Sequence, residues 1–170
     1  MPHHGVAVTI PQPWSTTLQQ ARADLGDPMA SAIPPHVTLL PPTPIAPEAM
    51  DEFLQHLAAA TASTEPFDMV LSGTGTFRPV SPVVFVQVSR GIGSCEALER
   101  AVRSGPVQRP LDFPYHPHVT VAHHLDEAAL DRAFESLADF RCAFRVATVE
   151  LFHHDDDGVW RVIDSFPLGS

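Results

Sequence analysis

The stretch PHVTL at residues 35–39 returns as PHVTV at residues 117–121, about half a chain later. Both stretches have the β-branched composition that is typical of strands. Side chains two apart on a strand point to the same face, so each copy places its His and Thr on one face and its aliphatic residues in the core. If the two strands lie side by side about a pseudo-two-fold axis, two imidazoles and two hydroxyls converge on one pocket.

Short predicted elements surround both copies, and 18 prolines punctuate them. Strands are predicted at 5–10, 36–40, 67–72, 83–88, 118–122, 144–152 and 159–166. Helices are predicted at 14–25, 47–60, 94–103 and 126–140, the last two with Ser94 and Asp126 as N-caps. Residues 67–72 and 83–88 are expected to pair antiparallel, and the Asp-Gly at 157–158 predicts a hairpin turn. This mixture indicates an α+β fold.

Composition limits the chemistry more sharply than the elements do. The 170 residues suffice for a single domain over 1–170, and all 10 basic residues are Arg. Without Lys, the chain has no phosphate loop of the Walker type, no Schiff-base cofactor chemistry and no nucleotidyl-lysine intermediate. The formal charge of −10 argues against a long nucleic-acid groove. A small nucleotide or a phosphorylated end remains compatible with this charge.

The chain shows no signal of export or of a membrane partner. No apolar run approaches the roughly 20 residues of a membrane-spanning helix, and residues 1–5 do not resemble a signal peptide. Cys95 and Cys142 match no metal or redox spacing, so they are expected to be reduced, packed thiols. We therefore expect a cytoplasmic monomer.

The paired His and Thr residues suit the opening of a cyclic phosphodiester. That reaction needs one group to deprotonate a water and another to protonate the departing ribose oxygen. His36 and His118 can divide these roles, and such acid-base catalysis typically contributes roughly 10²- to 10⁴-fold. The hydroxyls of Thr38 and Thr120 can donate to the non-bridging phosphate oxygens. No metal or other cofactor is required.

With these motifs, the chain resembles the two-histidine phosphoesterase superfamily, in its bacterial 2′-5′ RNA ligase and cyclic phosphodiesterase branch. The resemblance covers the strand at 5–10, both His-x-Thr motifs, and the stretches at 67–77 and 115–122. It implies a bilobal fold in which two antiparallel sheets line a central cleft with helices outside. It also implies metal-independent hydrolysis of 2′,3′-cyclic or related phosphodiesters, with reversible 2′-5′ ligation of RNA ends in some members. In this comparison His36 and His118 are the acid-base pair, and Thr38 and Thr120 hold the phosphate.

The candidate substrate-binding residues include one departure from the family. Many relatives carry Arg shortly after the second motif, where this chain has His123. A histidine supplies positive charge only when it is protonated. Arg78 is the candidate to compensate as an anion contact, and Phe77 and Tyr115 are candidates to stack on a base.

Two other functions compete with this one. In the first, His116, His118, His123 and His124 bind a transition metal, together with His153, His154 or the acidic turn at 155–157. No third ligand follows a recognisable metal spacing, so this reading is less favoured. In the second, the protein binds nucleotides or RNA ends in the same cleft without turning them over.

Overall fold

Residues 2–169, the part of the chain that the computed structural model describes, form eight strands and four α-helices. The strands are β1 (His3–Thr9), β2 (His36–Pro44), β3 (Phe67–Thr76), β4 (Val83–Arg90), β5 (His118–His123), β6 (Arg141–Val146), β7 (Thr148–His154) and β8 (Trp160–Pro167). The helices are α1 (Trp14–Asp24), α2 (Met50–Ala62), α3 (Ile92–Arg103) and α4 (Glu127–Ser136), and a 3-10 turn, η1 (Pro47–Ala49), precedes α2. The predicted α+β class is confirmed.

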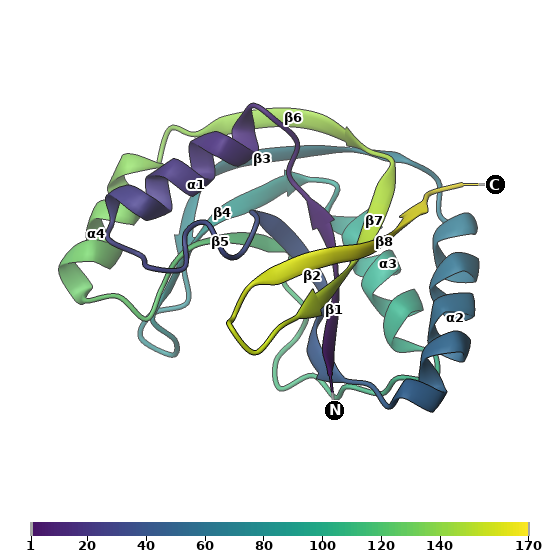
Figure 1. Ribbon diagram of the computed structural model, residues 1–170. Coiled ribbons are helices and arrows are strands. Elements are labelled where there is room, and N and C mark those ends of the chain that lie inside the picture. The colour runs from purple at the N-terminus through teal and green to yellow at the C-terminus, as the bar shows by residue number, and fades with distance from the viewer. Residues whose placement is uncertain (1, 170) are drawn as a thin grey trace.

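The strands form one curled antiparallel sheet in the order β6-β3-β4-β5-β2-β1-β7-β8 (Figure 1). Its two halves of four strands meet at β2 and β5, which are joined through the pair Val37 and Val119. The two sheets implied by the family resemblance are therefore the two halves of a continuous sheet. The two His-x-Thr strands lie next to each other at its centre.

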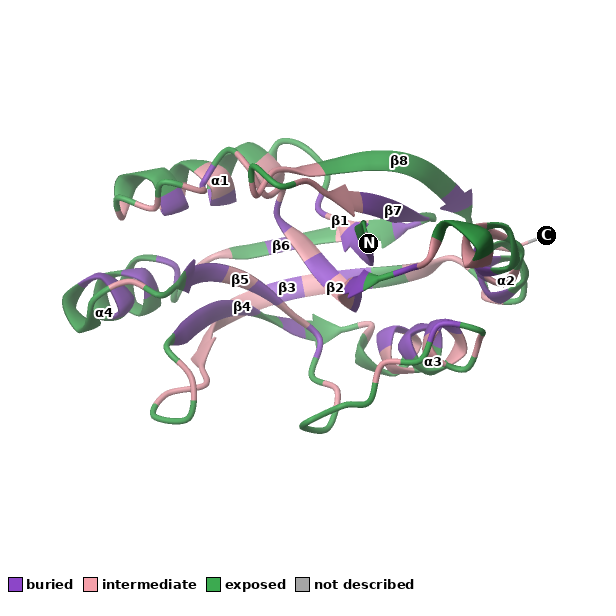
Figure 2. Ribbon diagram, turned by 60° about the horizontal axis from the view of Figure 1, so that its bottom comes forward, coloured by how far each residue is buried: buried purple, intermediate pink, exposed green. Residues whose placement is uncertain are grey.

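The four α-helices form two pairs that lie apart from each other. Figures 1 and 2 show α1 and α4 together at one end and α2 and α3 at the other. Helix α1 packs on β5 and α4 on β3, β4 and β5, whereas α3 packs on β2 and α2 on β8. Apolar side chains fill the space under the helices, among them Leu18 of α1, Phe53 of α2 and Leu98 of α3, each 0% exposed. The helices thus cover one face of the sheet and leave the other to the His and Thr side chains.

Three local features predicted from the sequence are confirmed: the cap of α4, the pairing of β3 with β4 and the hairpin of β7 and β8. Asp126 caps α4, because its carboxylate accepts a hydrogen bond of 2.8 Å from the backbone N–H of Ala129. The predicted pairing of β3 with β4 is present, and so is the β7–β8 hairpin, whose turn has Gly158 at φ +81°. Gly tolerates this left-handed conformation, which explains its place in the turn.

Three predictions about elements were wrong. Helix α3 begins at Ile92, two residues before the predicted cap Ser94, because Gly91 turns the chain there with φ +98°. The predicted strand at 144–152 is two strands, β6 and β7, which part after Val146 and pair in different halves of the sheet. Their apolar residues run on without a strong breaker, so the sequence pattern does not reveal the change of partner. The predicted helix at 126–140 also ends early, at Ser136.

Both cysteines are free and buried, as the sequence predicted. Burial raises the pKa of Cys95 to about 12, so its thiol stays protonated at neutral pH. Within residues 2–169, no helix has the length and apolar character needed to cross a bilayer.

Candidate active site

The sheet register brings the two His-x-Thr motifs onto one face. Val37 and Val119 are paired across β2 and β5, and both are 0% exposed in the core. Because the strands are antiparallel, His36 lies opposite Thr120 and Thr38 lies opposite His118, all on the other face. Directly opposed side chains have Cβ atoms about 5 Å apart. The two motifs thus share one face of the sheet, as strand alternation predicted, and of their four polar side chains Thr38 and His118 line the cavity described below.

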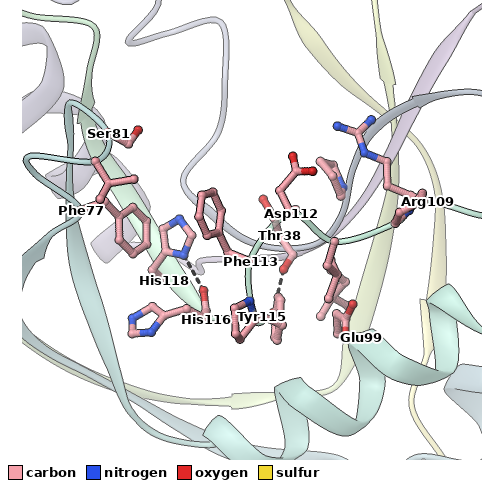
Figure 3. Close-up of a pocket in the computed structure, with 16 residues that line it drawn as sticks. Thr38, Phe77, Ser81, Glu99, Arg109, Asp112, Phe113, Tyr115, His116 and His118 are labelled. Carbon is pink, nitrogen blue, oxygen red and sulfur yellow. Dashed lines mark hydrogen bonds between the residues drawn. The ribbon is translucent and has the colours of Figure 1, made fainter.

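The same hydrogen bond orients each of the two histidines. Nδ1 of His36 lies 2.6 Å from the backbone oxygen of Pro34, and Nδ1 of His118 lies 2.6 Å from that of His116 (Figure 3). A carbonyl only accepts, so Nδ1 carries the proton and donates it. Nε2 of each neutral ring is then the nitrogen left to accept a proton.

This orienting contact was missed in the sequence analysis, although a signal for it exists. In both motifs a proline precedes the histidine, and it biases the residue before it toward an extended backbone. That residue supplies the carbonyl in both cases.

Aromatic side chains pack against both imidazoles. The ring centroid of His36 lies 4.6 Å from that of Trp160, and the centroid of His118 lies 5.0 Å from that of Phe77. Burial lowers the pKa of His36 to about 4 and also lowers the pKa of His118, although the carbonyl contact opposes the shift in each case. Both imidazoles are consequently neutral in the free protein near neutral pH.

Removing the indole of Trp160, which lies beside His36, should reverse part of the lowering of the His36 pKa. In Trp160→Ala, water reaches the imidazole, the protonated form is solvated, and we expect the pKa of His36 to rise toward its ordinary value of about 6.5. NMR titration of the histidine ring protons measures the shift. Trp14→Ala is the matched control, because Trp14 stacks on Phe144 of the edge strand β6 and should leave His36 unchanged. An unchanged or lower pKa in Trp160→Ala would contradict the assigned cause.

A cavity of about 550 Å³ opens beside Thr38 and His118 (Figure 3). Its walls come from β2, the turn after β3 and the segment before β5, and they include Phe77, Tyr115 and His116. The hydroxyl of Tyr115 donates a hydrogen bond of 2.7 Å to the backbone oxygen of Thr38. Burial raises the pKa of Tyr115, so this donor keeps its proton. Tyr115 thus fixes the cavity wall to the first motif strand.

Phe85 packs against two residues of the cavity wall. Its ring lies 4.6 Å from that of Phe77 and 5.2 Å from that of His118. A Cβ added at Gly75 would meet the Phe85 ring at 2.6 Å, so only glycine leaves room for the ring there. This requirement explains the second glycine of the Gly-Thr-Gly run at 73–75.

The sequence model of the 2'-5' RNA ligase superfamily matches residues 10–158. The chain belongs to this superfamily. A Halalkalibacterium halodurans protein named "Putative phosphoesterase BH1439" is 25% identical over 169 residues, which are 98% of each chain. A Bacillus thuringiensis (strain Al Hakam) protein, also named "Putative phosphoesterase", is 26% identical over 145 residues, or 84% of each chain.

Solved structures of other proteins share the fold. The crystal structure of Escherichia coli LigT complexed with 3'-AMP has a TM-score of 0.69 at 16% identity and covers 100% of both chains. That of TT0787 from Thermus thermophilus has a TM-score of 0.66 at 20% identity and covers 99% of both. The overall fold of this chain is therefore shared with proteins of known structure.

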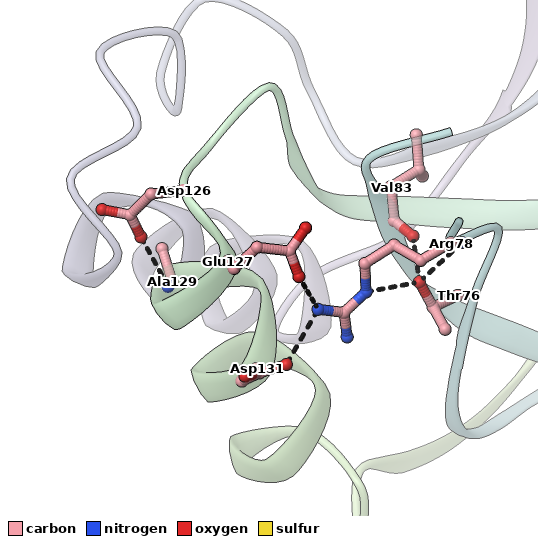
Figure 4. Close-up of polar contacts among 7 residues, drawn as sticks. All are labelled: Thr76, Arg78, Val83, Asp126, Glu127, Ala129 and Asp131. Carbon is pink, nitrogen blue, oxygen red and sulfur yellow. Dashed lines mark hydrogen bonds and ion pairs between the residues drawn. The ribbon is translucent and has the colours of Figure 1, made fainter. Parts of the chain in front are cut away.

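In this member of the superfamily, Arg78 points away from the cavity. Its guanidinium donates to Glu127 at 3.1 Å and to Asp131 at 2.8 Å, both on α4, and its Nε donates to the hydroxyl of Thr76 at 3.1 Å (Figure 4). Two carboxylates already match its charge. The prediction that Arg78 replaces the family's arginine as an anion contact is therefore not supported by its position.

We expect Arg78→Ala to leave the KM of a phosphodiester substrate within about twofold of the parent value, because the side chain serves α4. Steady-state kinetics on the two proteins decide this. A KM raised about tenfold or more, with kcat unchanged, would return Arg78 to the binding site.

His123 reaches the motif face through an irregularity in β5. Between Thr120 and Ala122, β5 carries one residue more than its partner β4. Val121 and Ala122 are both 0% exposed in the core, so the alternation restarts and returns His123 to the face of Thr120. His123 is exposed and stacks on His124 with ring centroids 3.6 Å apart. Partial burial and the neighbouring His124 lower its pKa, so it is mainly neutral near neutral pH.

The metal site considered from the sequence has no geometric support. Within residues 2–169, no three His, Cys, Asp or Glu side chains are grouped as metal ligands would be. The acids of the turn at 155–157 have other partners: Asp155 contacts His153 at 2.5 Å, and Arg161 pairs with both Asp155 and Asp157. The turn is therefore explained by its own ion pairs.

Proposed function

We propose that this protein is a metal-independent phosphoesterase that hydrolyses 2′,3′-cyclic phosphates or related 2′-5′ phosphodiesters of nucleotides or RNA ends. The observation that carries the proposal is the matched pair of histidines. Each lies on the same face of the sheet, each is fixed through Nδ1 by a backbone carbonyl, and each keeps Nε2 for proton transfer. Membership of the 2'-5' RNA ligase superfamily supports this chemistry, and so do the relatives named as phosphoesterases.

In the proposed reaction the two histidines carry out opposite proton transfers. The neutral imidazole takes a proton from water through Nε2 while the water oxygen bonds to phosphorus. The protonated imidazole gives its proton to the ribose oxygen as the bond from that oxygen to phosphorus breaks. The net result is that one water is consumed, the base ends protonated and the acid ends neutral. Proton exchange with solvent then restores the starting protonation states.

The hydroxyls of Thr38 and Thr120 are suited to hold the phosphate. Among the described residues neither hydroxyl has a hydrogen-bond partner, and both lie on the motif face beside the histidines. Each can donate to a non-bridging oxygen, where negative charge develops in the transition state.

Substrate binding has to supply the acid. Because burial depresses the pKa of both imidazoles, the free protein holds both in the neutral form near neutral pH. A phosphate anion bound between them favours a protonated imidazole and raises the pKa of the ring that faces it. The substrate thus prepares one histidine as the acid while the other stays a base.

The experiment that tests this function is turnover of the four nucleoside 2′,3′-cyclic monophosphates and a 2′-5′-linked dinucleotide in the presence of EDTA, with the position of the product phosphate resolved. Hydrolysis that persists in EDTA supports the proposal and shows which ester bond breaks. A folded protein that binds these compounds and hydrolyses none of them would instead favour a binding protein with the same cleft.

A further inference from the structure

Arg109 is the one arginine among the described residues that line the cavity beside His118. Figure 3 shows its side chain and that of His118 at opposite ends of the cavity. Arg109 is held in place through Nη1, which donates to the backbone oxygen of Pro42 at 2.8 Å and to the hydroxyl of Thr43 at 3.4 Å. The segment before β5 is thereby fixed against the end of β2.

The remaining donors of this guanidinium are free. Arginine has five N–H donors, of which the two on Nη1 are used here. Neither Nε nor Nη2 of Arg109 has a hydrogen-bond partner in the part of the chain that the structure describes. These two nitrogens form the edge that binds two oxygens of one phosphate side by side.

The nearby acids leave the charge of Arg109 unmatched. Glu99 also lines the cavity, but it is 2% exposed and accepts from Nε of Arg103 at 2.7 Å, so its charge is balanced. Asp112 is exposed at the cavity rim and forms no ion pair with Arg109. By contrast, Arg78 is bound by two carboxylates on α4.

Apolar groups line the cavity between the two ends. Phe113, Leu111 and Pro110 come from the segment before β5, and Phe77 and Val80 come from the turn after β3. Such walls suit a nucleoside, whereas a guanidinium suits a phosphate. The volume of about 550 Å³ is in the range that small-molecule sites occupy.

We propose that Arg109 binds a second phosphate of the substrate, on the side of the nucleoside away from the reacting phosphate. The preferred substrate is then a nucleotide phosphorylated on both sides of its ribose, either a free bisphosphate or the terminal nucleotide of an RNA strand. This inference rests on the proposed function, because it takes the reacting phosphate to lie between His36 and His118.

The test is calorimetric binding of product-like ligands, which does not depend on turnover. The ligands are adenosine 3′-monophosphate, adenosine 3′,5′-bisphosphate and a dinucleotide that ends in a 3′-phosphate. The proteins are the parent, Arg109→Gln, Asp112→Asn and, as the matched control, Arg132→Gln on α4, which lies outside the cavity. The measured quantity is the gain in affinity that the second phosphate brings.

In the parent and in Arg132→Gln, we expect the bisphosphate or the dinucleotide to bind at least about tenfold more tightly than the monophosphate. In Arg109→Gln this gain should fall to about twofold or less, while the affinity for the monophosphate stays the same. Asp112→Asn should increase the gain, because it removes a negative charge near the second phosphate. The ligand with the larger gain identifies the source as a free bisphosphate or an RNA end.

The inference is overturned if the second phosphate brings no gain in the parent with either ligand, or if Arg109→Gln keeps the gain. It is also overturned if Arg109→Gln weakens all three ligands equally, because Arg109 then only holds the cavity wall. Failure of the proposed function has a different signature: second-phosphate binding that depends on Arg109 in a protein that hydrolyses no phosphodiester.

Discussion

Replacing either His36 or His118 with alanine is expected to lower kcat/KM on the best phosphodiester substrate by about 10²- to 10⁴-fold. In the proposed reaction each variant lacks one of the two proton transfers, because water at the same position is a poorer acid and a poorer base. The strand register places both imidazoles on one face of the sheet beside the two threonine hydroxyls. Because the acid and the base act in the same reaction, one histidine does not substitute for the other. Initial rates of the parent and the two variants in EDTA measure the loss.

The controls for this prediction separate chemistry from folding. His3→Ala changes an exposed histidine at the start of β1 and should retain full activity. The double variant should lose little more than the worse single variant, because residues that act as a unit do not contribute additively. Full activity in either single variant, with unfolding curves like that of the parent, would remove that histidine from the mechanism.

The second large effect concerns stability in acid. The pKa of His36 is lowered from 6.5 to about 4 in the folded protein, mainly by burial. Between these two values the unfolded chain binds more protons at His36 than the folded chain does, so stability falls as the pH falls. The complete shift corresponds to about 3 kcal/mol. This contribution is present above about pH 6.5 and is lost as the pH approaches 4.

Urea unfolding of the parent and of His36→Gln at several pH values between about 7 and 4 measures this contribution. Glutamine does not titrate. Over this range the free energy of unfolding of the variant should therefore fall by up to about 3 kcal/mol less than that of the parent. The carboxylates titrate in both proteins and cancel in the comparison. Parallel curves would show that His36 titrates normally in the folded protein.

Strand alternation was sufficient to predict that the two His-x-Thr motifs share one face of the sheet. His36 with Thr38, and His118 with Thr120, are each two apart in a strand, and the valine between them is buried as predicted. Local signals also identified the hairpin before β8 and the cap of α4. These features depend on residues close together in the sequence, which is why a single sequence reveals them.

The remaining features depend on contacts between distant segments. Arg78 follows a glycine-rich stretch and could face the cavity, but its position is decided by Glu127 and Asp131, about 50 residues later. The extra residue in β5 that returns His123 to the motif face appears only in its pairing with β4. The parting of β6 and β7 likewise depends on which strands they pair with, and no local composition specifies that choice.

The free end of Arg109 could not be found from the sequence for the same reason. Six other arginines pair with carboxylates: Arg22, Arg78, Arg90, Arg103, Arg145 and Arg161. Only the structure distinguishes an arginine whose charge is matched from one that faces a cavity with donors to spare.

Once a phosphate lies between them, one of His36 and His118 should hold a second ring proton while the other stays neutral, and ¹⁵N NMR of the imidazole rings at about pH 7 detects this difference. In the free protein we expect two neutral rings, each with its proton on Nδ1. With adenosine 3′-monophosphate bound, one ring should become the doubly protonated imidazolium while the other stays neutral. Two rings that are already charged in the free protein, or two that do not respond to the ligand, would rule out the proposed acid-base pair.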